Sequence, residues 1–493
     1  MGKLRLVPLL ALTLALGCHN GNAPAIVDAG PDLPPPVMLE AACTDTIASI
    51  YADPGALPAE KGAIIRCAPD QTFTASELQA KLAADDFTAR PVTSGAHTYR
   101  ILYRTERGDT ANTAGYSSAL VMLPDLPRAP KLPVVVASHG SRGQAAADAP
   151  SLFDPIDSGV NIDFERQVYS LAGYGYAVIA PDLAGYANYG AANNPPSGYA
   201  FAADVAKSTL DGARALRKLI PSRLEDQVVL VGHSQGGHTA LSALAMSASY
   251  GAGGTIAAVV VYAPLWLNEA SWGAIFIAPG LYPTMGSEAV NAVTIWYHYT
   301  HSEILDGPGH GVDVFAAAKQ AQVKAWVDSA GWDDNNWASL RALGADASEI
   351  FDPTFQQAVG SPAANGADCP ADANQALCQK WLARYAADRP HITGAAAQVP
   401  ITVLWGEKDT TIPYDRITCA IDRLKQDGVP LTVCVDPTGD HSGVIDHRAD
   451  YAADFIASKT LGTPAPTPCA LDETAIKDPK GMPATCNMLP PNN

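Results

Sequence analysis

A serine flanked by glycines follows a short apolar run near the middle of this 493-residue chain. Residues 228–231 (Val-Val-Leu-Val) are typical of a buried strand, residues 232–236 are Gly-His-Ser-Gln-Gly, and a helix-like run begins at Thr239. A G-x-S-x-G turn between a strand and a helix is typical of a serine nucleophile, because the sharp turn exposes the hydroxyl. We therefore expect Ser234 to be a nucleophile, with the Gln235 N–H at the helix start facing developing negative charge. The alternative is an ordinary serine in a tight glycine turn.

Further segments carry a family resemblance. They are Ser-His-Gly at 138–140, Ala-Pro-Ser at 149–151, Gly-Tyr-Gly-Tyr-Ala-Val-Ile-Ala-Pro-Asp at 173–182, Gly-His-Ser-Gln-Gly-Gly-His at 232–238 and Trp-Gly-Glu-Lys-Asp-Thr-Thr-Ile-Pro at 405–413. Together they resemble the α/β-hydrolase superfamily and, within it, bacterial relatives of the secretory lipase family. The segments occur in family order between residues 98 and 455. The resemblance implies a fold and a reaction type, but it names no substrate.

A serine nucleophile needs an imidazole to accept its proton and an acid to orient that imidazole. The resemblance implies the order serine, acid, histidine along the chain. Asp409 lies on the loop after the strand-like run 400–405, and His441 lies on the loop after the run 431–435. We therefore predict a Ser234–Asp409–His441 triad. Three alternatives stay open: Glu407 as the acid, His447 as the base, and Asp409 as a surface turn residue.

A tetrahedral oxyanion needs a second N–H donor besides Gln235. The resemblance places this donor on the loop after residues 138–140, which favours Ser141, although these residues also fit a simple tight turn. His233 and His238, on either side of Ser234, are interpreted as packing or polar-network residues. His298 and His301 lack the H-E-x-x-H spacing of a helix-borne zinc site. We expect no metal and no cofactor.

The charge of the chain limits its partners. It has 32 basic and 50 acidic residues, for a formal net charge of −18. This balance argues against nucleic acid or an anionic membrane surface as the partner. We expect a small-molecule ester or lipid substrate, and the sequence leaves the oligomeric state open.

The amino terminus has the pattern of an export signal. Lys3 and Arg5 precede an apolar run from Leu6 to Leu16 that is too short to span a bilayer stably. Residues 14–18 (Leu-Ala-Leu-Gly-Cys) resemble a bacterial lipoprotein cleavage box, which implies that Cys18 becomes the acylated first residue. A cell-envelope lipoprotein, anchored only through this lipid, is therefore expected. Ordinary secretion is the alternative.

The chain has nine cysteines, and assigning Cys18 to lipid leaves an even set of eight, which favours an oxidising compartment. Pairing neighbours in sequence predicts four disulfides: Cys43–Cys67, Cys369–Cys378, Cys419–Cys434 and Cys469–Cys486. A Cys419–Cys434 bond would link the helix after Asp409 to the strand before His441.

Strand-like and helix-like runs alternate along the chain, which predicts a mostly parallel sheet with helices on both faces. The alternation of strand-like and helix-like runs stops between Pro264 and about Gln398. This stretch holds seven of the eight tryptophans. We interpret it as a largely helical cap, with most of these tryptophans in its core and a subset lining an acyl pocket. A helix over 76–84, capped by Ser76 and Gln79, is expected near the amino terminus.

These features divide the chain into seven parts. They are a signal peptide (1–17), a Pro-rich tether (18–40), an amino-terminal extension (41–97), the first part of the core (98–264), the cap (265–398), the second part of the core (399–462) and a Pro-rich carboxy-terminal extension (463–493).

The sequence thus predicts a serine hydrolase of carboxylic esters, a lipase or esterase that works through an acyl-enzyme. Two other classes stay open. The same triad serves peptidases, thioesterases and acyltransferases, and a hydrolase fold can act as a surface binding protein.

Overall fold

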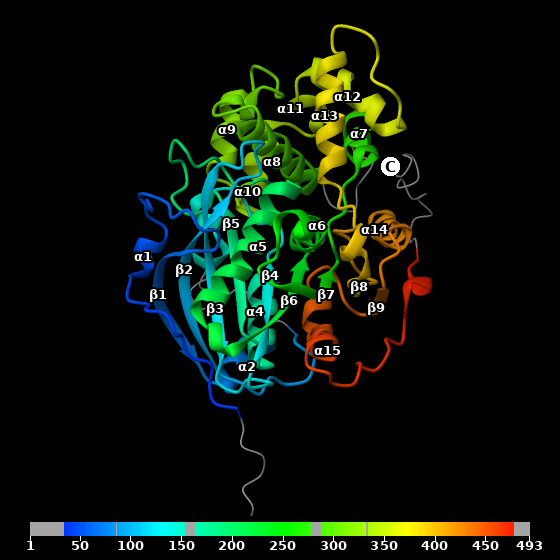
Figure 1. Cartoon of the computed structure of the whole chain (residues 1–493). Helices are drawn as coiled ribbons and strands as arrows, with labels where there is room; N and C mark the ends of the chain where they lie inside the picture. The colour runs from blue at the N-terminus through cyan, green and yellow to red at the C-terminus, as the bar shows by residue number, and fades with distance from the viewer. Residues whose placement is uncertain (1–33, 85, 153–162, 279–286, 332–333, 478–493) are drawn as a thin grey trace, which may run out of the picture. The chain divides into compact units, whose positions relative to one another are not determined.

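A single sheet forms the centre of the computed structural model, which describes residues 34–84, 86–152, 163–278, 287–331 and 334–477. Over these residues the sheet has nine strands in the order β1-β2-β3-β5-β4-β6-β7-β8-β9 (Figure 1). The strands are β1 Ile64–Phe73, β2 Ala96–Glu106, β3 Ala114–Pro124, β4 Leu132–Ser138, β5 Val178–Ala184, β6 Leu224–His233, β7 Thr255–Tyr262, β8 Ile401–Gly406 and β9 Leu431–Asp436. Pairing is antiparallel from β1 through β3 to β5 and parallel from β5 through β9.

Alternation along the strands divides the buried apolar residues between two cores. Val134 and Val136 of β4 belong to one apolar cluster, and Val135 and Ala137 belong to the other. A strand covered on both faces has this pattern, because successive side chains point to opposite sides. The predicted fold class is confirmed.

Helices cover both faces. The helices α2 Ala75–Ala83, α4 Asp163–Gly173 and α15 Gly443–Thr460 pack on one face, and α5 Ala202–Leu219, α6 Gln235–Tyr250 and α14 Tyr414–Gln426 pack on the other (Figure 1). The residues of α2 are close to the predicted range, but its cap is different. Thr74 accepts from the Glu77 N–H and Glu77 accepts from the Thr74 N–H, so the predicted Ser76–Gln79 capping box is wrong.

The stretch between β7 and β8 is helical, as expected. It contains α7 Glu269–Ile277, α8 Ser287–Leu305, α9 Gln320–Val327, α10 Asp334–Leu343, α11 Ala347–Ile350, α12 Pro353–Asn365 and α13 Gln375–Asp388 (Figure 1). Its apolar core is continuous with the cluster on the α5/α6 face of the sheet. Five of its tryptophans are at most 4% exposed, which places them in this core: Trp266, Trp272, Trp296, Trp326 and Trp381.

Both edges of the sheet are covered by chain that a disulfide holds in place. At the β1 edge, the Asp45 N–H donates to the Cys67 carbonyl, and Cys43 is bonded to Cys67. At the β9 edge, the Val435 N–H donates to the Leu471 carbonyl. Covering an edge in this way blocks unwanted pairing with another chain. The sequence did not predict β1, which contains Pro69 and two register shifts against β2.

The disulfides confirm half of the predicted pairing. Cys43–Cys67 and Cys369–Cys378 are bonded as expected. Cys434 is bonded to Cys469, so the predicted Cys419–Cys434 and Cys469–Cys486 pairs are wrong. Pairing cysteines by their closeness in sequence failed here, because the fold places Cys469 of the carboxy-terminal segment next to Cys434 of β9. Cys419 is also disulfide-bonded, while Cys18 and Cys486 lie outside the described residues.

The disulfides indicate an exported protein that folds in an oxidising compartment. Among the described residues, no helix combines the length and apolar character needed to cross a membrane.

Candidate active site

Ser234 lies at the sharp turn between β6 and α6. Its φ of 54° and ψ of −118° are strained values for a residue with a side chain. Four backbone hydrogen bonds hold this conformation. The Ser234 N–H donates to Tyr262 O at 2.9 Å, and the N–H groups of Gly237, His238 and Leu265 donate to Ser234 O at 2.9, 3.3 and 2.8 Å. The strain is therefore stabilised by the neighbouring strand β7 and by the first turn of α6.

The glycines around Ser234 are required by close packing. A Cβ on Gly232 would lie 2.0 Å from the Gly236 carbonyl oxygen, and a Cβ on Gly236 would lie 2.0 Å from the Ser138 carbonyl oxygen. A Cβ on Gly237 would lie 2.7 Å from the Cα of Pro264. Any larger residue at these positions would push α6 away from the strand ends. The turn can exist only with the glycines that the motif contains.

Asp409 and His441, which are 32 residues apart, are in direct contact. The His441 Nδ1–H donates to Asp409 Oδ2 at 2.8 Å. The other carboxylate oxygen accepts from the N–H groups of Thr411 and Ile412 at 2.8 and 2.9 Å. The Asp409 side chain is fully buried, while the imidazole is 16% exposed. This arrangement fixes the carboxylate in one orientation and leaves Nε2 of His441 free of that contact.

The loops that carry these two residues are locked together. The Glu407 N–H donates to Asp436 O at 2.8 Å, and the Lys408 N–H donates to Gly439 O at 3.0 Å. A Cβ on Gly406 would lie 2.3 Å from the Gly439 oxygen, so only glycine permits this approach. Backbone contacts between the ends of β8 and β9 therefore position the acid against the imidazole.

The His441 loop also lies against the serine turn. The ring of His233, the residue before Ser234, has its centroid 4.5 Å from that of His441. The His233 Nε2–H donates to the carbonyl oxygen of His441 at 2.8 Å. The structure thus brings the loops of all three predicted triad residues to one edge of the sheet.

The alternative acid and base have other surroundings. Glu407 is partly exposed, and its loop position is fixed by its backbone. His447 lies in α15, and its Nδ1 is 2.7 Å from Asp436 Oδ2. Contact with the Asp409 carboxylate therefore distinguishes His441 from His447.

The surroundings of His441 alter its basicity. Burial disfavours the charged ring, but the negative charge and hydrogen bond of Asp409, together with the charges of Asp163 and Asp440, outweigh burial. The net effect raises the pKa of His441 above its ordinary value of 6.5. A base with a raised pKa binds the proton of a serine hydroxyl more readily.

Gln235 follows Ser234 in the chain, and the residue before Ser141 lies close to the serine turn. Gln235 is the first residue of α6, where backbone N–H groups have no partner within the helix. The chain at Gly140 approaches the turn so closely that a Cβ there would lie 3.5 Å from Ser234 Cβ. Ser141 follows, and its Oγ is 2.7 Å from the Tyr199 hydroxyl. The position fits an oxyanion donor, and that role stays a prediction.

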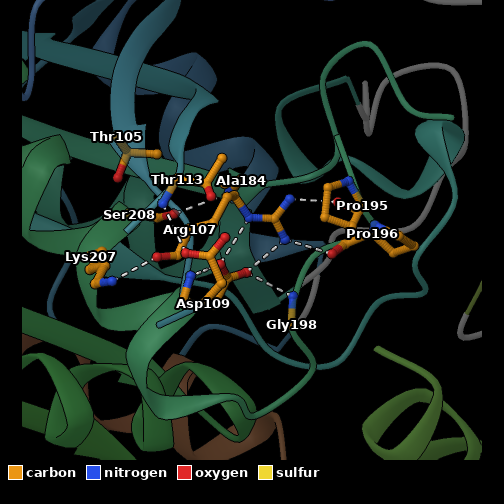
Figure 2. Close-up of polar contacts among 12 residues, drawn as sticks. Thr105, Arg107, Asp109, Thr113, Ala184, Pro195, Pro196, Gly198, Lys207 and Ser208 are labelled. Atoms are coloured by element: carbon orange, nitrogen blue, oxygen red, sulfur yellow. Dashed lines mark hydrogen bonds and ion pairs between the residues drawn. The ribbon is translucent and has the colours of Figure 1, made fainter. Parts of the chain in front are cut away.

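A buried ion pair supports the segment that carries Tyr199. Arg107 and Asp204 are 2% and 1% exposed and are joined at 2.9 Å. The Arg107 guanidinium also donates to the carbonyl oxygens of Pro195 and Pro196 at 2.6 and 2.7 Å, as Figure 2 shows. Asp204 accepts from the Gly198 N–H at 3.0 Å. The pair therefore fixes the loop that leads to Tyr199 and, through it, Ser141.

Replacing Arg107 by methionine is expected to lower the free energy of unfolding by about 3–5 kcal/mol, because Asp204 would stay buried without its partner. Arg341→Met is the matched control. Arg341 pairs with Glu288 at 2.7 Å but is 57% exposed, so its loss should change stability by about 1 kcal/mol or less. Chemical denaturation measures both. Equal effects for the two variants would contradict the role given to the Arg107–Asp204 pair.

A polar network attaches the cap helices to α5 and α6. Asp388 of α13 accepts from the Tyr297 hydroxyl at 2.5 Å, from His301 Nε2–H at 2.6 Å and from the Ala202 N–H at 2.8 Å. The His238 Nε2–H of α6 donates to the Asp388 carbonyl at 2.7 Å. These contacts give His301 of the cap and His238 of α6 structural roles. Over the described residues, no group of three or more potential ligands is arranged to hold a metal ion.

Residues 134–454 match the sequence model of the alpha/beta hydrolase family, which is more than half of the chain. The chain therefore belongs to the alpha/beta hydrolase family. No curated protein matches it in sequence.

Solved structures share the fold. The rice cell wall degrading esterase LipA from Xanthomonas oryzae is similar with a TM-score of 0.58 and 19% identity, over 82% of this chain and 99% of that chain. Lipase A from Candida antarctica is similar with a TM-score of 0.54 and 17% identity, over 87% of this chain and 89% of that chain. A protein from Legionella pneumophila is similar with a TM-score of 0.61 and 18% identity, over 80% of this chain and 97% of that chain.

Proposed function

We propose that this protein is a serine hydrolase that cleaves carboxylic esters. The observation that carries the proposal is the 2.8 Å contact between His441 Nδ1 and Asp409 Oδ2, beside a serine held at φ 54° on a strand–helix turn. A strained serine and an acid-oriented imidazole at one sheet edge form the arrangement that activates a hydroxyl nucleophile. A binding protein would not need Ser234, His441 and Asp409 together.

The proposed reaction begins with attack of Ser234 Oγ on the acyl carbonyl carbon. Nε2 of His441 accepts the hydroxyl proton and then gives it to the leaving alcohol, while Asp409 keeps the ring in the correct tautomer. The resulting acyl-enzyme is hydrolysed by water, which His441 deprotonates in the same way. The N–H groups of Gln235 and Ser141 stabilise the oxyanion in both steps.

Esters are proposed over amides because of the resemblance to lipases and the names of two structural relatives, an esterase and a lipase. Part of the apolar cap would line the acyl pocket.

The test is a panel of p-nitrophenyl esters of rising acyl length, assayed beside aminoacyl p-nitroanilides. We expect ester hydrolysis with an optimum acyl length and little or no anilide cleavage. Anilide cleavage without ester cleavage would show that the same residues serve a peptidase.

The pH profile follows from the raised pKa of His441. The base must be neutral to accept a proton, so kcat/KM should fall as the pH decreases through an apparent pKa above 6.5. A profile of kcat/KM against pH on a soluble short-chain ester measures this pKa. An acidic limb below 6.5 would contradict the assigned surroundings of His441.

The amino terminus is proposed to anchor the protein. Acylation of Cys18 would tether an acidic, exported domain to the cell envelope through a Pro-rich segment. Replacing Cys18 by serine should move the protein from the membrane fraction to the soluble fraction. An unchanged membrane fraction would exclude the lipid as the anchor.

A further inference from the structure

A second aspartate and histidine, Asp163 and His233, lie next to the proposed triad. Asp163 is the first described residue of α4, and its Oδ2 is 2.7 Å from Nδ1 of His233. The His233 ring is fully buried, while the Asp163 side chain is 28% exposed. A Cβ on Gly140 would lie 3.2 Å from His233 Nδ1 and 3.3 Å from Asp163 Oδ2. The pair therefore lies where three segments meet: the loop at Gly140, the serine turn and the His441 loop.

Both ring nitrogens of His233 face oxygen atoms. Nε2 is 2.8 Å from the His441 carbonyl oxygen, which can only accept a hydrogen bond, so Nε2 carries a hydrogen. Nδ1 is 2.7 Å from a carboxylate oxygen in a poorly aligned contact. A bare lone pair on Nδ1 would be repelled by that carboxylate. A neutral imidazole has only one N–H, so only the charged ring can direct an N–H toward both oxygen atoms.

Basic groups surround the Asp163 carboxylate. Burial acts to raise its pKa, but the positive charges of His233, His441 and Arg166 outweigh burial and hold the pKa below 3.8. Asp163 is therefore ionised at neutral pH. Arg166, on the same helix, also bonds Asp446 of α15 at 3.0 Å, which fastens α4 to the helix after His441.

We infer that Asp163 and a positively charged His233 form a positioning pair, which holds the backbone of His441 against the serine turn. The pair does not touch the reacting atoms. Its Nε2–H fixes the peptide that carries the base, and the positive ring stands 4.5 Å from that base. The charged groups that face His441 are then Asp409, Asp440, Asp163 and His233.

The charge state of His233 can be tested without any activity assay, by NMR of protein labelled with nitrogen-15 in its histidines. Above neutral pH, wild type should retain the signals of a doubly protonated imidazole that is absent from His233→Gln. Asp163→Asn should lose the same signals, because the amide removes the charge that keeps Nδ1 protonated. A wild type in which no doubly protonated ring disappears in His233→Gln would overturn the inference.

The positioning role predicts a specific kinetic pattern and rests on the proposed ester hydrolysis. In Asp163→Asn, kcat should fall roughly tenfold to hundredfold with KM little changed, because the base is misplaced and the substrate pocket is not. In His233→Gln, the acidic limb of kcat/KM should move to higher pH, since a positive charge is lost while Asp163 stays. A merely structural role would lower activity without moving this limb.

Asp313→Asn is the matched control. Asp313 pairs with His310 at the same 2.7 Å distance, but both side chains are more than half exposed. Its kinetics and pH profile should equal those of wild type. If wild type hydrolyses no ester, the proposed function fails while the NMR test still stands. If wild type is active and both pair variants keep its kcat and its acidic limb, the positioning role is wrong.

Discussion

Ser234→Ala is expected to lower kcat for ester hydrolysis by about 10⁵- to 10⁶-fold, leaving only the rate that binding and the oxyanion donors supply. The hydroxyl is the atom that forms the acyl-enzyme, so no neighbouring group replaces it. KM should change little, because the remainder of the site is intact. The free energy of unfolding should shift by about 0.5 kcal/mol or less, since alanine fits the same volume. Steady-state kinetics and denaturation of the purified variant provide both values.

Ser247→Ala is the matched control for this prediction. Ser247 lies in α6, the helix that follows Ser234, and its hydroxyl donates to the Leu244 carbonyl within the helix. Its kinetics should equal those of wild type. A Ser234→Ala variant with more than about one hundredth of the wild-type kcat would show that another nucleophile carries the reaction.

Asp409→Asn is expected to lower kcat by about 10⁴-fold with little change in structure. An asparagine amide can donate to Nδ1 of His441, which stabilises the tautomer that has its hydrogen on Nε2. That tautomer cannot accept the proton of Ser234. Loss of the carboxylate should also lower the pKa of His441, so the acidic limb of the residual activity should move to lower pH. Rates measured across the pH range test both effects together.

Glu407→Gln separates the two possible acids. Glu407 is two residues away on the same loop and is partly exposed, so its neutralisation should change kcat less than about tenfold. A larger loss in Glu407→Gln than in Asp409→Asn would reverse the assignment. His447→Gln serves the same purpose for the base, since His447 contacts Asp436 and should tolerate the change.

Short sequence patterns predicted the features that depend on residues close together in the chain, such as strands and tight turns. The strand-like runs predicted eight of the nine strands described, all except β1, because a strand covered on both faces is largely apolar. The glycines around Ser234 predicted a turn that only glycines permit, and the structure shows the close contacts that require them. The family resemblance, together with their positions on loops after strands, predicted Asp409 and His441, and the carboxyl ends of parallel strands meet at one edge.

The features that the sequence did not predict depend on contacts between distant segments. β1 has a broken apolar pattern, and its place in the sheet comes from pairing with β2. The Cys434–Cys469 bond spans 35 residues and reflects where the carboxy-terminal segment crosses β9. Asp163 lies 70 residues before His233, and no local motif marks it. Such residues can be identified only from the structure, where the fold brings distant segments into contact.

The most direct test of Ser234 as a nucleophile activated by His441 is covalent labelling with a fluorophosphonate, followed by mass spectrometry of the digested protein. We expect one phosphonylated residue, Ser234, and much slower labelling in His441→Gln, because the base no longer activates the hydroxyl. Absence of an adduct on Ser234 in folded wild-type protein, or equal labelling rates with and without the imidazole, would contradict this assignment.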